Sequence, residues 1–180
     1  MKITLLAGTN RPGSNTRKVV AHIEKIYRGA NVELSVLDLA QLPDEIFKAS
    51  SYAEKPASFA RFADLITKAD GVHIVTPEYN GGFPGVLKYF VDMLPHPQSF
   101  TQRPVVFTGL AVGMWGALRP VEQLQTLFTN LGATVCPQRV FLPGIGNLLS
   151  DSGEITDEAI AKRLTAQVND FVSFVGKLSK

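Results

Sequence analysis

The sequence predicts one α/β domain spanning residues 1–180, with a five-stranded parallel sheet and helices on both of its faces. Short apolar runs alternate with segments of helical periodicity along the whole chain, which gives five β-then-α units. Strands that alternate with helices pair in parallel through right-handed crossovers, and the helices then cover both faces of the sheet. The chain length suits one domain and is sufficient to bury a core without disulfides or a structural metal.

The first two units fill the N-terminal third of the chain. The apolar run Ile3–Ala7 predicts a buried strand, and apolar residues at helical spacing over 19–26 predict a helix after it. The apolar residues of Val32–Val36 alternate with polar ones, which predicts a second strand with one face less buried. Helical spacing returns over 59–69 and predicts the second helix.

The third and fourth units repeat this pattern. Strands are expected at Val72–Val75 and Val105–Leu110. The helices that follow are expected over 87–94 and 121–131, each with a proline in its first turn (Pro84 and Pro120), where the missing N–H is harmless. Gly132 is the expected stop of the fourth helix.

The fifth unit closes the domain. Its strand is expected at Thr134–Cys136, with a second piece at Val140–Leu142 after Pro137. Apolar spacing over 160–175 predicts the last helix, and Asp157 and Glu158 are favourably placed for the dipole of its first turn.

Three loops are expected to carry the function, because ligands of an open parallel sheet bind at the carboxyl ends of its strands. Each of the three directly follows an apolar strand: Gly8–Asn15, Thr76–Gly85 and Leu110–Leu118. The longest polar stretch, Asp38–Pro56, is either a lid or partner surface or a solvated loop.

Composition excludes several classes of protein. The net charge is +2 without a dense Lys/Arg cluster, which disfavours nucleic-acid binding. No apolar stretch is long enough for a transmembrane helix or a signal peptide, so a cytoplasmic protein without membrane contact is expected. Cys136 is the single cysteine, which fits a reducing compartment and predicts a small buried apolar residue. The three histidines show no metal-binding spacing, and His73 in a buried strand is expected to be a hydrogen-bonded core residue.

The first loop, Gly8–Thr16, has the composition of an anion site. It opens a helix, whose N-terminal N–H groups and dipole favour negative charge. Arg11 adds a charged donor that suits phosphate geometry. The loop also offers short polar side chains from four residues, which are Thr9, Ser14, Asn15 and Thr16.

Two common phosphate motifs do not match this loop. Gly8 and Gly13 have the spacing of a Walker A motif, but Ser14 stands in place of its lysine. Asn10 occupies the middle glycine of a dinucleotide fingerprint. A hydroxyl-rich loop for one terminal phosphate fits best. The alternative is that Ser14 or Asn15 only caps the helix, but capping does not explain the presence of Arg11 in the loop.

The second loop, Thr76–Gly85, follows the third strand with two prolines and the pair Gly81–Gly82, which permits a close approach to a flat ligand. Here the sequence resembles the NADPH-dependent FMN reductase family, which includes quinone, chromate and azo-dye reductases. The family motif G-[ST]-x-R-x-x-S-x-N is matched at Gly8, Thr9, Arg11 and Ser14. The longer motif P-E-Y-N-x-x-x-P-x-x-L-K-N-x-x-D is matched at Pro77, Glu78, Tyr79, Asn80, Pro84, Leu87, Lys88 and Asp92.

The resemblance implies a flavodoxin-like three-layer sandwich with strand order 2-1-3-4-5 and a bound FMN. The FMN phosphate is expected to bind Thr9, Arg11, Ser14, Asn15 and Thr16. The edge of the isoalloxazine ring is expected to lie against Pro77, Glu78, Tyr79, Asn80 and Gly81, with Gly113 closing the other side. No metal and no catalytic side chain is expected, because the flavin carries the chemistry.

The resemblance also implies a reaction. NADPH or NADH is expected to pass a hydride to the flavin, and a small-molecule acceptor such as a quinone or a flavin to receive the electrons in ping-pong fashion. A homodimer or homotetramer is expected. The alternatives are a flavodoxin-like electron carrier, although such carriers are usually strongly acidic, and a flavin-binding redox sensor.

Some residues depart from the family pattern. Asn15 lies one position ahead of the motif asparagine, where Thr16 stands, and Tyr89 replaces an asparagine. The third loop lacks the usual serines and glycines and contains Met114 and Trp115. Trp115 is expected to shape the flavin pocket, to pack at a subunit interface or to fill a plain packing role.

Overall fold

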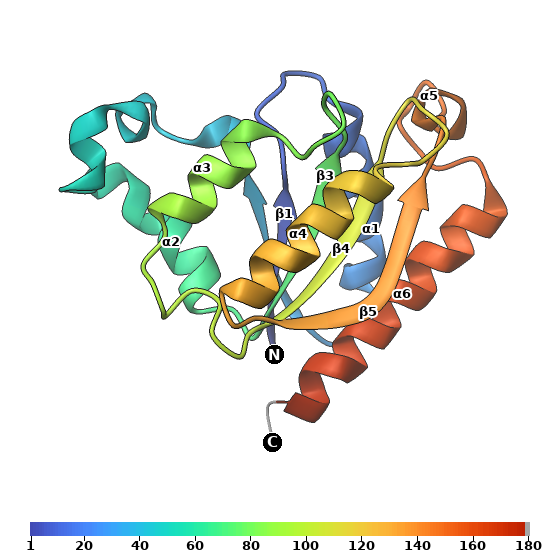
Figure 1. Cartoon of the computed structure of the whole chain (residues 1–180). Coiled ribbons are helices and arrows are strands. Elements are labelled where there is room, and N and C mark those ends of the chain that lie inside the picture. The colour runs from blue at the N-terminus through green and yellow to red at the C-terminus, as the bar shows by residue number, and fades with distance from the viewer. Residues whose placement is uncertain (179–180) are drawn as a thin grey trace.

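The computed structural model describes residues 1–178 and shows a parallel five-stranded sheet of order β2-β1-β3-β4-β5 between two helical layers (Figure 1). The strands are β1 Lys2–Ala7, β2 Glu33–Asp38, β3 Gly71–Pro77, β4 Pro104–Leu110 and β5 Thr134–Leu142. The helices are α1 Asn15–Arg28, α2 Ala60–Thr67, α3 Gly85–Met93, α4 Leu118–Asn130, α5 Ile145–Leu148 and α6 Glu158–Leu178. The predicted fold class and strand order are confirmed.

The sheet separates two apolar cores, because successive side chains of a strand point to opposite faces. Leu6 and Ile74 belong to the core under α2, α3 and α4, while Leu5 and Val75 belong to the core under α1 and α6. Burial on both faces explains the unbroken apolar runs of the central strands. The edge strand β2 is half-buried over Leu34–Val36, as its alternating pattern predicts.

Three details differ from the sequence-based expectations. The fifth strand is continuous, and its register shifts opposite Val105–Phe107, where the bulge accommodates Pro137 without a ladder hydrogen bond. Pro84 caps α3 instead of lying in its first turn, because α3 begins at Gly85. The stretch 38–56 contains three short 3₁₀ helices, Leu39–Gln41, Asp44–Phe47 and Ala49–Tyr52, which are too short to show a periodic signal.

Gly8 joins the first loop closely to the end of β3. Its N–H donates to the carbonyl oxygen of Val75 at 2.8 Å. A Cβ atom built on Gly8 would lie 2.8 Å from that same backbone oxygen, closer than real Cβ contacts. A glycine is therefore required here, and the first loop starts in direct contact with the strand that leads into the second loop.

A chain of buried hydrogen bonds surrounds His73 on the α1/α6 side of the sheet. The Tyr27 hydroxyl lies 2.9 Å from Nδ1, and Nε2 lies 2.8 Å from Oγ1 of Thr108. Thr108 donates to Oε1 of Gln167 at 2.6 Å, so it accepts from Nε2–H and Tyr27 donates to Nδ1. The prediction of a satisfied core histidine is confirmed, and burial lowers the pKa of His73 to about 3.

This network predicts a pH-dependent stability. Below the ordinary histidine pKa of 6.5 the unfolded chain binds a proton that the folded chain takes up only near pH 3. The free energy of unfolding should therefore fall as the pH drops, by about 2 kcal/mol from this group between about pH 7 and pH 5. Urea unfolding of the wild type and of His73→Gln measures the effect. The variant should show a flatter pH dependence in this window, and identical slopes would contradict the account.

Candidate functional site

A pocket of about 510 Å³ lies at the carboxyl edge of the sheet, within the size range of small-molecule sites. The first loop lines it with Arg11–Thr16, and the second loop lines it with Pro77–Gly81. The third loop contributes Leu110–Gly113 and Trp115, and two further residues complete the lining, Arg119 of α4 and Ile145 of α5. The three loops expected to carry the function thus meet in one place.

The residues that the sequence places at the site all line this pocket except Thr9. Thr9 lies below the lining with 1% of its surface exposed. Its Oγ1 is 2.9 Å from the hydroxyl of Tyr79 and accepts the N–H of Arg11 at 3.2 Å. The structure therefore shows Thr9 as the link between the first and second loops.

Capping explains only part of the first loop. Ser14 is the N-cap of α1, and its Oγ accepts the N–H of Arg17 at 3.4 Å. Thr16 is 1% exposed and lines the pocket, but its Oγ1 has no hydrogen-bond partner within the described residues. A buried hydroxyl without a partner is unfavourable, so a ligand acceptor would stabilise it.

The second loop is a tight turn. Tyr79 and Gly82 exchange two backbone hydrogen bonds of 2.8 and 3.0 Å, and Asn80 and Gly81 between them have φ of 52° and 80°. Positive φ at both central positions is the type I′ geometry that an Asn-Gly pair favours. The N–H of Glu78 donates to the carbonyl of Leu110 at 3.1 Å, which fastens this turn to the third loop.

Glu78 provides a second buried polar atom without a hydrogen-bond partner in the pocket lining, after Oγ1 of Thr16. Its side chain is 9% exposed, and Oε1 lies 2.5 Å from Nη2 of Arg119. Its other oxygen, Oε2, is buried and has no partner among residues 1–178. The pocket therefore has one unused hydroxyl donor, at Thr16, and one unused carboxylate acceptor, at Glu78, from two different loops.

The third loop has a fixed backbone and exposed apolar side chains. Gly116 has φ of 56°, and a Cβ atom there would lie 2.8 Å from the backbone nitrogen of Pro143. Ala117 also has a positive φ of 71°, and the N–H of Leu118 donates to the carbonyl of Trp115 at 3.0 Å. Trp115 is 55% exposed and lines the pocket.

Sequence reasoning missed some of the lining residues. Arg119 lies in the first turn of α4, which begins three residues earlier than the periodicity indicates. Ile145 belongs to a helix of four residues after β5 and has no sequence signal. Val112 and Trp115 fall inside the predicted loop Leu110–Leu118, so the loop could be found although its individual contacts could not.

The structure also bears on Cys136 and on the Lys88–Asp92 pair, which lie outside the pocket, and on the questions of a membrane helix and a metal site. Cys136 is 2% exposed, and burial raises the pKa of its thiol, which confirms a buried apolar role. Lys88 and Asp92 pair along α3, with Nζ and Oδ1 2.7 Å apart. Within residues 1–178, no helix is long and apolar enough to cross a membrane. No group of three or more His, Cys, Asp or Glu side chains in that range is arranged to hold a metal ion.

The fold and the pocket together define a class of protein. A parallel sheet with its pocket between a helix N-terminus and a tight glycine-containing turn is the architecture of nucleotide- and flavin-binding α/β proteins. The family model of NADPH-dependent FMN reductases matches residues 1–146, and the chain belongs to this family. The prediction of an NAD(P)H-dependent oxidoreductase that works with FMN and a small-molecule acceptor is thereby confirmed, and the electron-carrier alternative loses its support.

Individual relatives agree with this assignment. The chain is 30% identical over 185 residues to a quinone reductase of Escherichia coli strain K12, with 99% of this chain and 97% of the relative covered. It superposes on FerB, a flavoenzyme NAD(P)H:acceptor oxidoreductase from Paracoccus denitrificans, with a TM-score of 0.83, 26% identity and coverage of 98% and 97%. An oxidised flavodoxin from Bacillus cereus shares the fold, with a TM-score of 0.61, 14% identity and coverage of 96% and 98%.

The unpartnered hydroxyl of Thr16 predicts an unusual response to mutation. Thr16→Val keeps the shape of the side chain and removes a donor that no protein group uses, so the free energy of unfolding of FMN-free protein should stay equal or rise. Thr9→Val is the matched control. It removes a hydroxyl that contacts Tyr79 and should lower that free energy by about 1 kcal/mol. Equal losses in the two variants, measured by urea unfolding, would show that Thr16 has an internal partner.

Proposed function

We propose that this protein binds FMN in the pocket and uses NADPH or NADH to reduce quinones, flavins or similar two-electron acceptors. The observation that carries the proposal is the pair of unused polar atoms in the pocket, Oγ1 of Thr16 and Oε2 of Glu78. FMN offers a complementary group to each of them. Its phosphate accepts hydrogen bonds, and its flavin ring carries an N–H donor.

The first loop fits the phosphate of FMN. The N-terminus of α1 presents unpaired N–H groups and the positive end of the helix dipole, and the Thr16 hydroxyl adds a donor. Ser14 and Asn15 line the same end of the pocket. The exposed side chain of Arg11 also lines it and is free to form a charge-assisted hydrogen bond with a phosphate.

The second and third loops fit the flavin ring. Gly81 lacks a side chain, and no atom lies within 4 Å of the position where a Cβ would stand, so the backbone there is open to a flat ligand. Pro77, Tyr79, Asn80 and Gly113 line the same pocket. Oε2 of Glu78 would accept the ring N–H, while Oε1 keeps its ion pair with Arg119.

FMN, when bound, supplies the transfer of two electrons between NAD(P)H and the acceptor. In the overall reaction NAD(P)H loses a hydride, and the acceptor gains that electron pair together with two hydrogens, the second one a proton from solvent. No acid or base of the chain is needed for this balance. The protein binds and orients the reactants, and both use the pocket opening in turn, which gives ping-pong kinetics.

We also propose that the protein works in the cytoplasm as a homodimer or homotetramer. The support for an oligomer is an aromatic patch on the surface. Phe47 is 46% and Tyr52 is 59% exposed, and both contact Tyr89, with ring centroids 5.2 and 5.9 Å apart. Exposed apolar patches of this kind mark contact surfaces. The support for the cytoplasm is the single buried cysteine, which suits a reducing compartment.

The proposed function is tested by purifying the protein with added FMN and following NADPH and NADH oxidation with and without a quinone. The expected result is a yellow protein that oxidises NAD(P)H in a single turnover by itself and continuously when a quinone is present. A colourless protein that neither binds FMN nor oxidises either nucleotide would refute the proposal.

Arg11→Ala tests the phosphate end of the site. The side chain of Arg11 is exposed, so its loss should leave the stability of FMN-free protein unchanged. FMN affinity should fall about ten- to hundred-fold, because a charged hydrogen bond contributes about 1.5–3 kcal/mol. Riboflavin, which lacks the phosphate, is the matched control, and its affinity should be the same for both proteins. An unchanged FMN affinity in titration calorimetry would place the phosphate elsewhere.

A further inference from the structure

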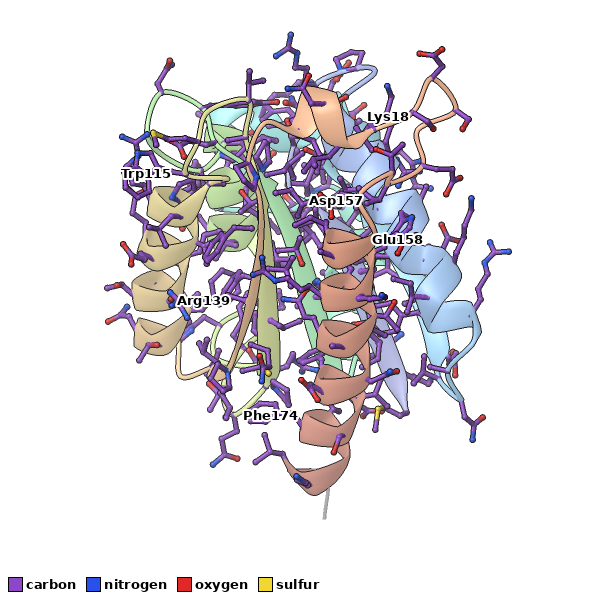
Figure 2. All side chains as sticks on the ribbon, turned by 90° about the vertical axis from the view of Figure 1, so that its right-hand side faces the viewer. Lys18, Trp115, Arg139, Asp157, Glu158 and Phe174 are labelled. Carbon is purple, nitrogen blue, oxygen red and sulfur yellow. The ribbon has the colours of Figure 1, made fainter. Side chains whose placement is uncertain are left out.

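The third loop exposes three large apolar side chains beside the pocket. Val112 is 83%, Met114 is 79% and Trp115 is 55% exposed. Figure 2 shows Trp115 beside the first turn of α4, at the end of the molecule where the pocket opens. Val112 and Trp115 line the pocket, whereas Met114 does not. Val112 and Trp115 therefore form an apolar wall of the pocket. Met114 lies outside the pocket and can serve as a control for the other two.

This exposure is built into the backbone of the loop. The carbonyl of Gly113 accepts N–H groups from Gly116 and from Gly144, each at 3.4 Å, and Ile145 donates to Ala111 at 3.0 Å. The close packing of Gly116 against the end of β5 leaves the loop no room to turn inward. The backbone at Trp115 is therefore fixed, and its indole keeps a large apolar surface in water, which is unfavourable unless a ligand covers it.

We propose that Trp115, together with Val112, is a specificity-determining residue that selects extended aromatic acceptors over small ionic ones. The inference rests on the proposed function, in which the acceptor enters through this opening. A fused-ring quinone would stack on the indole face and bury its apolar surface there. The indole N–H has no hydrogen-bond acceptor within residues 1–178 and would donate to a quinone oxygen.

The pocket also has cationic side chains near this apolar wall, and they allow a small anionic acceptor to serve as a reference substrate. Arg119 lies four residues after Trp115, and its side chain is 59% exposed while it pairs with Glu78. Arg11, also exposed, lines the pocket too. In the FMN-loaded protein Arg11 is expected to pair with the phosphate, so Arg119 is the cation that attracts an anionic acceptor, which needs no contact with the indole. Ferricyanide, of which two ions accept the electrons of one NAD(P)H, therefore reports turnover that does not require stacking on the indole.

The experiment compares kcat/KM for a naphthoquinone and for ferricyanide at saturating NAD(P)H in the FMN-loaded protein. Trp115→Ala should lower the ratio of the naphthoquinone value to the ferricyanide value about ten-fold, mainly by raising the KM for the naphthoquinone. Trp115→Phe retains a stacking face and should restore most of the loss. Met114→Ala removes a more exposed apolar side chain outside the pocket and should change neither value.

Several outcomes would overturn the inference. They are an unchanged ratio of the two values in Trp115→Ala, an equal loss for both acceptors, or the same effect from Met114→Ala. A change in oligomeric state in Trp115→Ala, measured by size-exclusion chromatography with light scattering, would assign the indole to a subunit contact instead. If the wild type oxidises no NAD(P)H with any acceptor, the proposed function fails as well. If the wild type is active and Trp115→Ala leaves the ratio of the two kcat/KM values unchanged, only the proposed role of Trp115 is refuted.

Discussion

The contact between Gly8 and the carbonyl of Val75 determines how the site is assembled. Because no side chain fits between them, the end of β1 lies directly against the end of β3. The first loop then reaches the second, where Thr9 meets the hydroxyl of Tyr79. The second loop reaches the third through the N–H of Glu78 and the carbonyl of Leu110. The pocket is thus formed by loops that successive backbone contacts hold together along one edge of the sheet.

The three loops contribute different physical properties to this pocket. The first offers N–H groups, a buried hydroxyl and a cation, and so it suits an anion. The second is a rigid turn that exposes backbone, with an ion-paired carboxylate below it. The third presents apolar side chains on a fixed backbone. FMN has three parts that match these three loops in the same order: a charged phosphate end, a flat polar ring edge and an apolar ring face. The atoms left without partners at Thr16 and Glu78 reduce the stability of the FMN-free fold, a common compromise at functional sites.

Much of this arrangement could be predicted from the sequence, since its signals are local. Continuous apolar runs such as Ile3–Ala7 identify strands buried on two faces, and the loops that follow them identify the edge where ligands bind. The ion pair between Glu78 and Arg119, and the place of Ile145 in the lining, arise from elements that meet only in the folded chain. Periodicity carries no information on such contacts. The sequence assigns Thr9 to the FMN phosphate and gives no sign of its contact with Tyr79, which lies 70 residues away along the chain.

The central claim is that the two unpartnered atoms of the pocket are completed by FMN, and a crystal structure of the FMN complex tests it most directly. The account predicts the phosphate at the N-terminus of α1, within hydrogen-bond distance of Oγ1 of Thr16, and the flavin ring beside Glu78 and the turn at Asn80–Gly81. A structure in which FMN lies elsewhere, or in which Thr16 and Glu78 keep their unpartnered atoms, would contradict it.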